Sequence, residues 1–125
     1  MESKRQKQVA ETVKRNFGIV LQERGGYIYG SEAFVTVTNV KVSPDLSIAK
    51  IYLSVYNIED KQNVILQLEQ ENAQLKQALA HRIRKHVRKI PQVDFYLDDT
   101  LDEMYRLNQL FDQINKEDDQ EEESA

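Results

Sequence analysis

The chain has 125 residues, of which 40% are hydrophobic and 30% charged, and its formal net charge is −4. This length suits a single domain with a buried core. The absence of cysteine excludes a disulfide framework and a thiolate nucleophile, and it fits a reducing compartment. No apolar run is long enough to span a bilayer, and the N-terminus lacks the apolar core of a signal peptide. We therefore expect a cytoplasmic protein with no membrane partner.

Residues 5–23 are predicted to form an amphipathic helix that ends at the glycine pair Gly25–Gly26. The buried stripe of this helix consists of Val9, Val13, Phe17, Val20 and Leu21. Lys7 and Lys14 lie two turns apart on another face, where they are expected to support a basic surface. Residues 27–33 are expected to form a loop or a short irregular edge.

Residues 33–43 and 48–56 alternate apolar and polar side chains and are rich in β-branched residues, so both are predicted to be strands. The turn-forming sequence of residues 43–46 joins them into an antiparallel hairpin. The apolar alternation of the first strand slips by one position, which predicts a β-bulge near Thr38–Asn39.

Helical periodicity then runs from Asn63 to Ile90, and Pro91 ends it. A straight helix of this length would measure about 40 Å, which is too long for so small a domain. Because the apolar stripe thins in the middle, we predict a kink within residues 70–74. The predicted kink residues are Glu71, Asn72 and Ala73. We expect Asn72 to leave helical geometry, since asparagine tolerates positive φ better than its neighbours.

A short strand, residues 93–97, and a last helix, residues 101–115, are predicted to complete a domain that spans residues 4–116. Residues 117–125 contain six acids and no base, and we expect this acidic tail to be disordered. Without the six charges of the tail, residues 1–116 carry a net charge of +2. The predicted order α-β-β-α-kink-α-β-α corresponds to an α+β fold, a three-stranded sheet packed by helices on one face.

The segment 72–91 contains no acid, although the protein is acidic overall. Its basic residues are Lys76, Arg82, Arg84, Lys85, Arg88 and Lys89. Apolar residues recur every three or four positions, so as a helix the segment would bury one face and expose a cationic one. A face built only for solubility usually mixes both signs. We therefore predict that these six residues, helped by Lys7 and Lys14, bind RNA.

Catalytic and metal sites are poorly supported. His81 and His86 are five residues apart and fall on different helical faces, which makes them poor joint metal ligands. The acids of 98–103 are better explained as a helix start, because Thr100 and Glu103 match a capping box. We expect no enzyme activity, no metal, no cofactor and no small-molecule substrate.

The alternative function is a protein-interaction module that uses the helical segment 63–90 as a docking or dimerising surface. Its interrupted apolar pattern is too short for a stable coiled coil. We therefore expect the free protein to be a monomer.

Three stretches, in this order, resemble the bacterial ribosome-binding factor A family. They are FVTVTNVKVSPDLSIAKIYLSV at residues 34–55, LAHRIR at 79–84 and IPQVDFYLDDTLDEMYRLNQL at 90–110. The resemblance covers residues 4–115, and Glu71-Asn72-Ala73 stands at the positions where the family has the Ala-x-Gly that marks its kink, a departure from the family pattern. It implies a type II KH-like fold, binding to the small (30S) ribosomal subunit during late maturation and 16S rRNA processing, and no catalysis.

Overall fold

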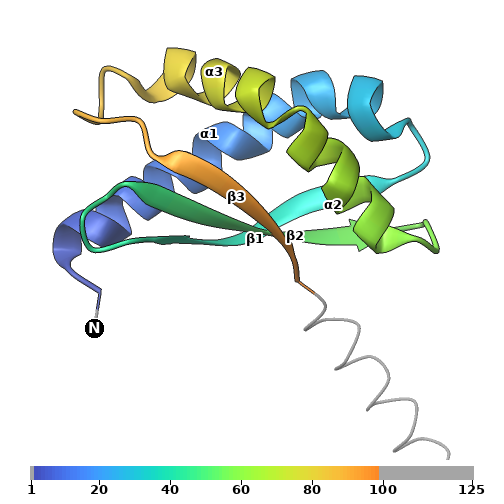
Figure 1. Cartoon of the computed structure of the whole chain (residues 1–125), viewed down its shortest axis with the longest axis horizontal. Coiled ribbons are helices and arrows are strands. Elements are labelled where there is room, and N and C mark those ends of the chain that lie inside the picture. The colour runs from blue at the N-terminus through green and yellow to red at the C-terminus, as the bar shows by residue number, and fades with distance from the viewer. Residues whose placement is uncertain (1, 99–125) are drawn as a thin grey trace, which may run out of the picture.

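The computed structural model describes residues 2–98 of the chain. In order, these residues form α1 (Lys4–Tyr29), β1 (Phe34–Val42), β2 (Ile48–Tyr56), α2 (Lys61–Gln70), α3 (Asn72–Ile83) and β3 (Gln92–Leu97). The central strand β2 pairs antiparallel with β1 and parallel with β3. Figure 1 shows the helices on one face of this sheet, which confirms the predicted layers. The predicted last helix, 101–115, and the acidic tail, 117–125, lie outside the described residues.

The start of α1 is set by a capping box. The backbone N–H of Gln6 donates to Ser3 Oγ at 3.1 Å, and the N–H of Ser3 donates to Gln6 Oε1 at 2.7 Å. These bonds satisfy N–H groups that have no partner inside the helix. The predicted apolar stripe of α1 is buried. Gln6 also donates through Nε2 to the carbonyl of Val42 at 2.9 Å, which ties the start of α1 to the end of β1.

The end of α1 differs from the prediction, because the helix continues through the glycine pair to Tyr29. Gly25 is buried, and the ring of Tyr29 occupies the space that a Cβ at Gly25 would need. The helix ends instead at Gly30, whose φ is 88° and whose N–H bonds the carbonyl of Gly26 at 3.1 Å. Residues 27–29, predicted to be loop, are therefore helical, since Gly25 serves packing inside the helix.

The hairpin of β1 and β2 forms as predicted, and its register shifts between Val37 and Asn39, where the bulge was expected. Asp45 holds the connecting turn, since its Oδ1 accepts hydrogen bonds from the hydroxyls of Ser43 and Ser47, both at 2.7 Å. The backbone N–H of Ser47 donates to the same oxygen at 3.1 Å. These bonds stabilise the carboxylate and lower the pKa of Asp45 to about 2, and the bond from the Ser47 hydroxyl has the largest effect.

The kink lies within the predicted range, but Asn72 is not the residue that leaves the helix. Glu71 interrupts the helical geometry with φ −99° and ψ 17°, and Asn72 is the first residue of α3. These angles fall in the bridge region, which requires no positive φ. The bend is therefore made without left-handed backbone, and the expectation for Asn72 was wrong.

The segment 72–90 is not one helix, because α3 ends at Ile83. The N–H groups of His86 and Val87 both bond the carbonyl of Ile83, at 2.8 and 3.1 Å, and close a turn. Helix through Ile90 would carry the chain about 10 Å further along the axis, away from the start of β3. Val87 is nevertheless buried and Ile90 half-buried, so the apolar pattern predicted burial correctly and the type of element wrongly.

The core lies between the helices and the sheet. Phe17 of α1 stacks on Phe95 of β3, with ring centroids 5.4 Å apart. The core residues contributed by α2 and α3 are Val64, Ile65, Leu68, Leu75, Leu79 and Ile83. Because this apolar stripe is already covered, it offers no surface for the alternative function, docking or dimerising through 63–90.

Candidate nucleic-acid interface

Three segments meet at one end of the sheet: the start of α1, the β1–β2 turn, and the loop 84–91 between α3 and β3. The side chain of Gln6 bonds Val42 at the end of β1. The N–H of Gln92 bonds the carbonyl of Ser47, just before β2, at 2.8 Å. Figure 1 shows the N-terminus, this turn and the loop toward the same side of the molecule. The fold therefore gathers segments that are far apart in the sequence.

Two of these segments carry exposed cations at this end of the sheet, and we call this set the basic end. Its members are Lys4, Arg5, Lys7, Arg84, Lys85, Arg88 and Lys89. All seven side chains are exposed, and none of them forms a hydrogen bond or ion pair within residues 2–98. Like charges held close together repel one another, and a polyanion that binds them relieves this repulsion. Phosphate oxygens are the matching partner, since guanidinium groups bind them with paired hydrogen bonds.

The loop 84–91 presents its cations from an anchored backbone. Val87 and Pro91 are buried, while the basic residues on either side of Val87 point to solvent. The turn bonds to Ile83 hold the start of the same loop. Because the buried residues between the cations hold the backbone in place, this loop loses less conformational freedom on binding a ligand than a flexible loop would.

Three of the predicted RNA-binding residues do not join the basic end. Lys14 lines a groove between α1 and β1. Arg82 donates through Nε to Asn16 Oδ1 of α1 at 3.3 Å, and so links two helices. Lys76 is half-buried in α3, about 10 Å along the helix axis from Ile83. The predicted single cationic helix face is therefore wrong, since most of the basic residues lie on the loop.

At the kink, the side chains of Glu69 and Asn72 hydrogen-bond to the outer edge of β3, and we call these two contacts the latch. The N–H of Phe95 donates to Glu69 Oε1 at 2.9 Å, and Asn72 Nδ2 donates to the carbonyl of Val93 at 2.8 Å. Glu69 and Glu71 also place negative charge at the kink, which opposes the approach of phosphate. The contacts of Asn72 indicate a structural role for the kink, which holds the helix pair against the sheet.

Acidic residues gather at the opposite end of the sheet, where β1 begins and β2 ends. Asn57 Nδ2 donates to the carbonyl of Glu32 at 3.0 Å and joins the two loops at that end. Glu32, Glu59 and Asp60 are exposed there. Residues 2–98 hold 15 Lys and Arg against 11 Asp and Glu, a net charge of +4. The described part of the chain is therefore cationic and electrically polarised, with the basic end at one pole.

Comparison with known proteins places this chain in a family. The family described as Ribosome-binding factor A matches residues 5–111. Ribosome-binding factor A of Cytophaga hutchinsonii is 36% identical over 114 residues, which cover 91% of this chain and 85% of that protein. The protein of the same name from Chlorobium phaeobacteroides is 35% identical over 117 residues, covering 90% of this chain and 96% of that protein. The chain belongs to the ribosome-binding factor A family.

Solved structures of ribosome-binding factor A share the fold. The crystal structure of the Thermus thermophilus protein superposes with a TM-score of 0.61 at 20% identity, covering 74% of this chain and 94% of that one. A homology model of the Thermus thermophilus ribosome-binding factor A, fitted into the cryo-EM map of a 30S complex, gives a TM-score of 0.58 at 24% identity, covering 71% of this chain and 90% of that one. These likenesses confirm the KH-like fold that the resemblance to ribosome-binding factor A implied.

Sequence reasoning missed Lys4 and Arg5 as members of the basic end of this family member. Their place at the same end of the sheet as the loop 84–91 depends on the contact between Gln6 and Val42, which joins residues 36 positions apart and has no local signal. The two histidines, His81 and His86, are both exposed, and residues 2–98 contain no cluster of three metal-ligating side chains. None of the helices in the described part has the length and apolar character to cross a membrane.

Proposed function

We propose that this member of the ribosome-binding factor A family binds the small (30S) ribosomal subunit and acts in its late maturation, including 16S rRNA processing. Family membership supports this function, and the name of the relatives and the 30S complex of the Thermus thermophilus protein point the same way. The observation that carries the proposal is the basic end, a set of exposed cations without partners among residues 2–98.

The basic end recognises rRNA through its phosphates. Arg84 and Arg88, held outward by the buried side chain of Val87, supply paired donors, while Lys4 and Lys7 add charge from α1. The acidic pole at Glu32, Glu59 and Asp60 is repelled by the same phosphates and so orients the molecule on approach. The protein acts by binding alone, as a cytoplasmic monomer, with no catalysis, metal or cofactor.

The test is co-sedimentation with immature small subunits. Reversing both Arg84 and Arg88 to Glu should abolish co-sedimentation and leave the circular dichroism spectrum native, because both side chains are exposed. Binding of the unaltered protein should weaken steeply as salt rises, since phosphate contacts release counterions.

A matched control uses a single charge reversal elsewhere. Arg24→Glu changes an exposed arginine of α1 that is outside the basic end, whereas Arg88→Glu changes one inside it. Arg88→Glu should weaken binding much more than Arg24→Glu. Equal losses would show that net charge, and not the basic end, governs binding, and unchanged binding of the double variant would refute the site.

A further inference from the structure

The two outer strands of the sheet expose backbone hydrogen-bonding groups along their free edges, and side chains hydrogen-bond to some of these groups and so guard them. On β3, Glu69 accepts from the N–H of Phe95 and Asn72 donates to the carbonyl of Val93. An unguarded edge is a template for pairing with another chain, so such guards prevent unwanted strand addition.

The free edge of β1 is guarded over half of its length. The side chain of Gln6 donates to the carbonyl of Val42 at 2.9 Å. The N–H of Val40 donates to Asn39 Oδ1 at 2.9 Å. Both guards lie on the C-terminal side of the bulge.

The pairing of the sheet shows which residues of β1 direct their backbone groups outward. The N–H of Asp98 bonds the carbonyl of Leu53, so Leu53 and its alternate neighbours in β2 direct their backbone groups toward β3. The residues of β1 opposite this set therefore face away from β2. They are Val35, Val37, Val40 and Val42. Val40 and Val42 are the guarded pair, and within residues 2–98 no side chain guards Val35 or Val37.

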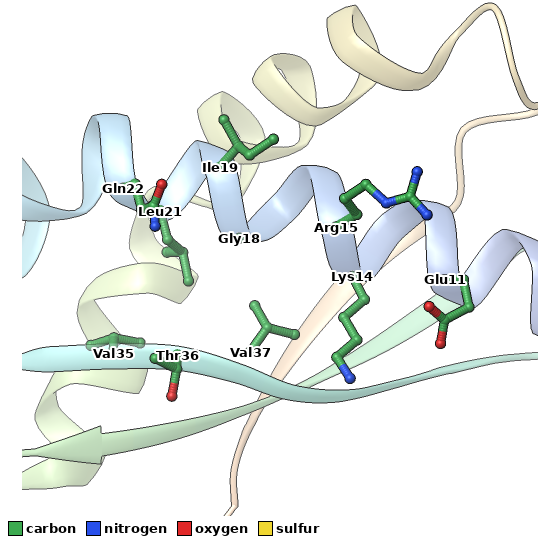
Figure 2. A pocket seen from close by; sticks show the side chains of 10 residues that line it. All are labelled: Glu11, Lys14, Arg15, Gly18, Ile19, Leu21, Gln22, Val35, Thr36 and Val37. Atoms are coloured by element: carbon green, nitrogen blue, oxygen red, sulfur yellow. The ribbon is translucent and has the colours of Figure 1, made fainter.

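The unguarded stretch opens into a groove. Figure 2 shows the groove between α1 and residues 35–37 of β1, and its volume is about 450 Å³. Leu21 and the half-buried side chains of Val35 and Val37 give it apolar walls, whereas Figure 2 shows Ile19 pointing away from β1. Gly18 lies on α1 across from Val37 and leaves the space between them open, because a Cβ there would meet no atom within 4 Å.

The charge of the groove selects an acidic occupant. Lys14 and Arg15 outnumber Glu11 in its lining, and Figure 2 shows Lys14 extending from α1 toward β1. Antiparallel pairing with β1 of a second copy would bring two sets of Lys14 and Arg15 together, which repulsion disfavours. A nucleic acid lacks the regular alternation of N–H and C=O groups that the edge of a strand requires.

We propose that the groove binds a short extended segment of a partner protein, which adds as a strand to Val35–Val37. The segment alternates aliphatic side chains, which contact Leu21 and the two valines, with an acidic side chain that pairs with Lys14. Main-chain hydrogen bonds supply the affinity, and the alternating side chains supply specificity. This surface is separate from the basic end, so it serves a protein partner beside the rRNA.

The test uses the full chain and a capped pentapeptide probe, Glu-Val-Thr-Val-Asp, followed by amide NMR. The peptide should shift the amide signals of Val35 and Val37 and slow their hydrogen exchange. A peptide N-methylated at the valine that donates to β1 should bind about tenfold more weakly, because it loses a main-chain bond and clashes with the edge.

The matched variants are Gly18→Leu and Gly26→Leu. Both place the same side chain on α1 where a Cβ would meet no atom, but only Gly18 lines the groove. Gly18→Leu should abolish peptide binding, Gly26→Leu should preserve it, and both should co-sediment with small subunits. Loss of co-sedimentation by Gly18→Leu alone would place the groove in the contact with the small subunit and refute its separation from the basic end.

Several results would overturn strand addition. They are equal binding of the N-methylated peptide, indifference to Gly18→Leu, and shifts confined to other parts of the sheet. Val35 and Val37 protected in a dimer of the free protein would assign the edge to a second copy. Binding of a uridine oligonucleotide at the same amides, without the peptide effect, would assign it to RNA.

Discussion

Asn72→Ala tests the latch that holds the kink to β3. The substitution removes the hydrogen bond from Asn72 Nδ2 to the carbonyl of Val93, which is 2.8 Å long and partly buried. Such a bond contributes about 1 kcal/mol, and the carbonyl left without its donor adds up to about 1 kcal/mol of desolvation cost. The higher helix propensity of alanine at the start of α3 returns about 0.5 kcal/mol. The expected net loss is about 1 kcal/mol of unfolding free energy.

The matched control is Asn63→Ala in α2. Asn63 is exposed, and its side chain makes no hydrogen bond within residues 2–98, so alanine there should stabilise the helix by about 0.5 kcal/mol. Urea unfolding followed by circular dichroism measures both variants. Their midpoints should differ by about 0.5–1 M, given the slope expected for a domain of this size. If the two variants had the same midpoint, the bond from Asn72 would contribute nothing to the latch.

Three further predictions concern a glycine, an acid and the tail. Gly26→Ala should raise the free energy of unfolding by about 0.5–1 kcal/mol, whereas Gly25→Ala should lower the melting temperature, because its Cβ would displace the half-buried Tyr29 ring. The pKa of Asp45 is lowered from 3.8 to about 2, so the ionised carboxylate contributes fully to stability above pH 4, and this contribution is lost as pH falls toward 2. Asp45→Asn should remove this part of the acid dependence of stability. NMR titration of the Asp45 carboxyl should show the low pKa. Deleting residues 117–125 should leave the melting temperature nearly unchanged. It should also strengthen non-specific RNA binding in a filter assay, since six acids no longer repel phosphate. A large drop in melting temperature would show that the tail docks on the fold.

Local sequence patterns predicted the hairpin accurately. Alternation over residues 48–56 gave the bounds of β2 as observed, and the slip in apolar phase located the bulge near Thr38. Both signals show which side of the strand is buried. They can be read from the sequence because successive side chains of a strand point to opposite faces.

Other local signals were overridden by contacts that the sequence does not show. The glycine pair at Gly25–Gly26 is a typical helix end, but the ring of Tyr29 packs over Gly25 and the helix continues. At the kink, Glu71 makes the bend with ordinary angles, and Asn72 stabilises it by reaching Val93, 21 residues away. Local conformational preference is worth less than the packing and hydrogen bonds formed in the folded chain.

The sequence by itself determined the composition of the basic surface and the burial of its apolar partners. The acid-free segment 72–91 and the spacing of Ile83, Val87 and Ile90 are both visible without coordinates. Only the tertiary structure decided where the charges lie. The start of β3 beside Ser47 requires α3 to stop at Ile83, and the bond of Gln6 to Val42 brings Lys7 to the same end, while Lys14 falls on the groove. Burial periodicity is a property of neighbouring residues, whereas the position of a charge depends on contacts between residues far apart in the chain.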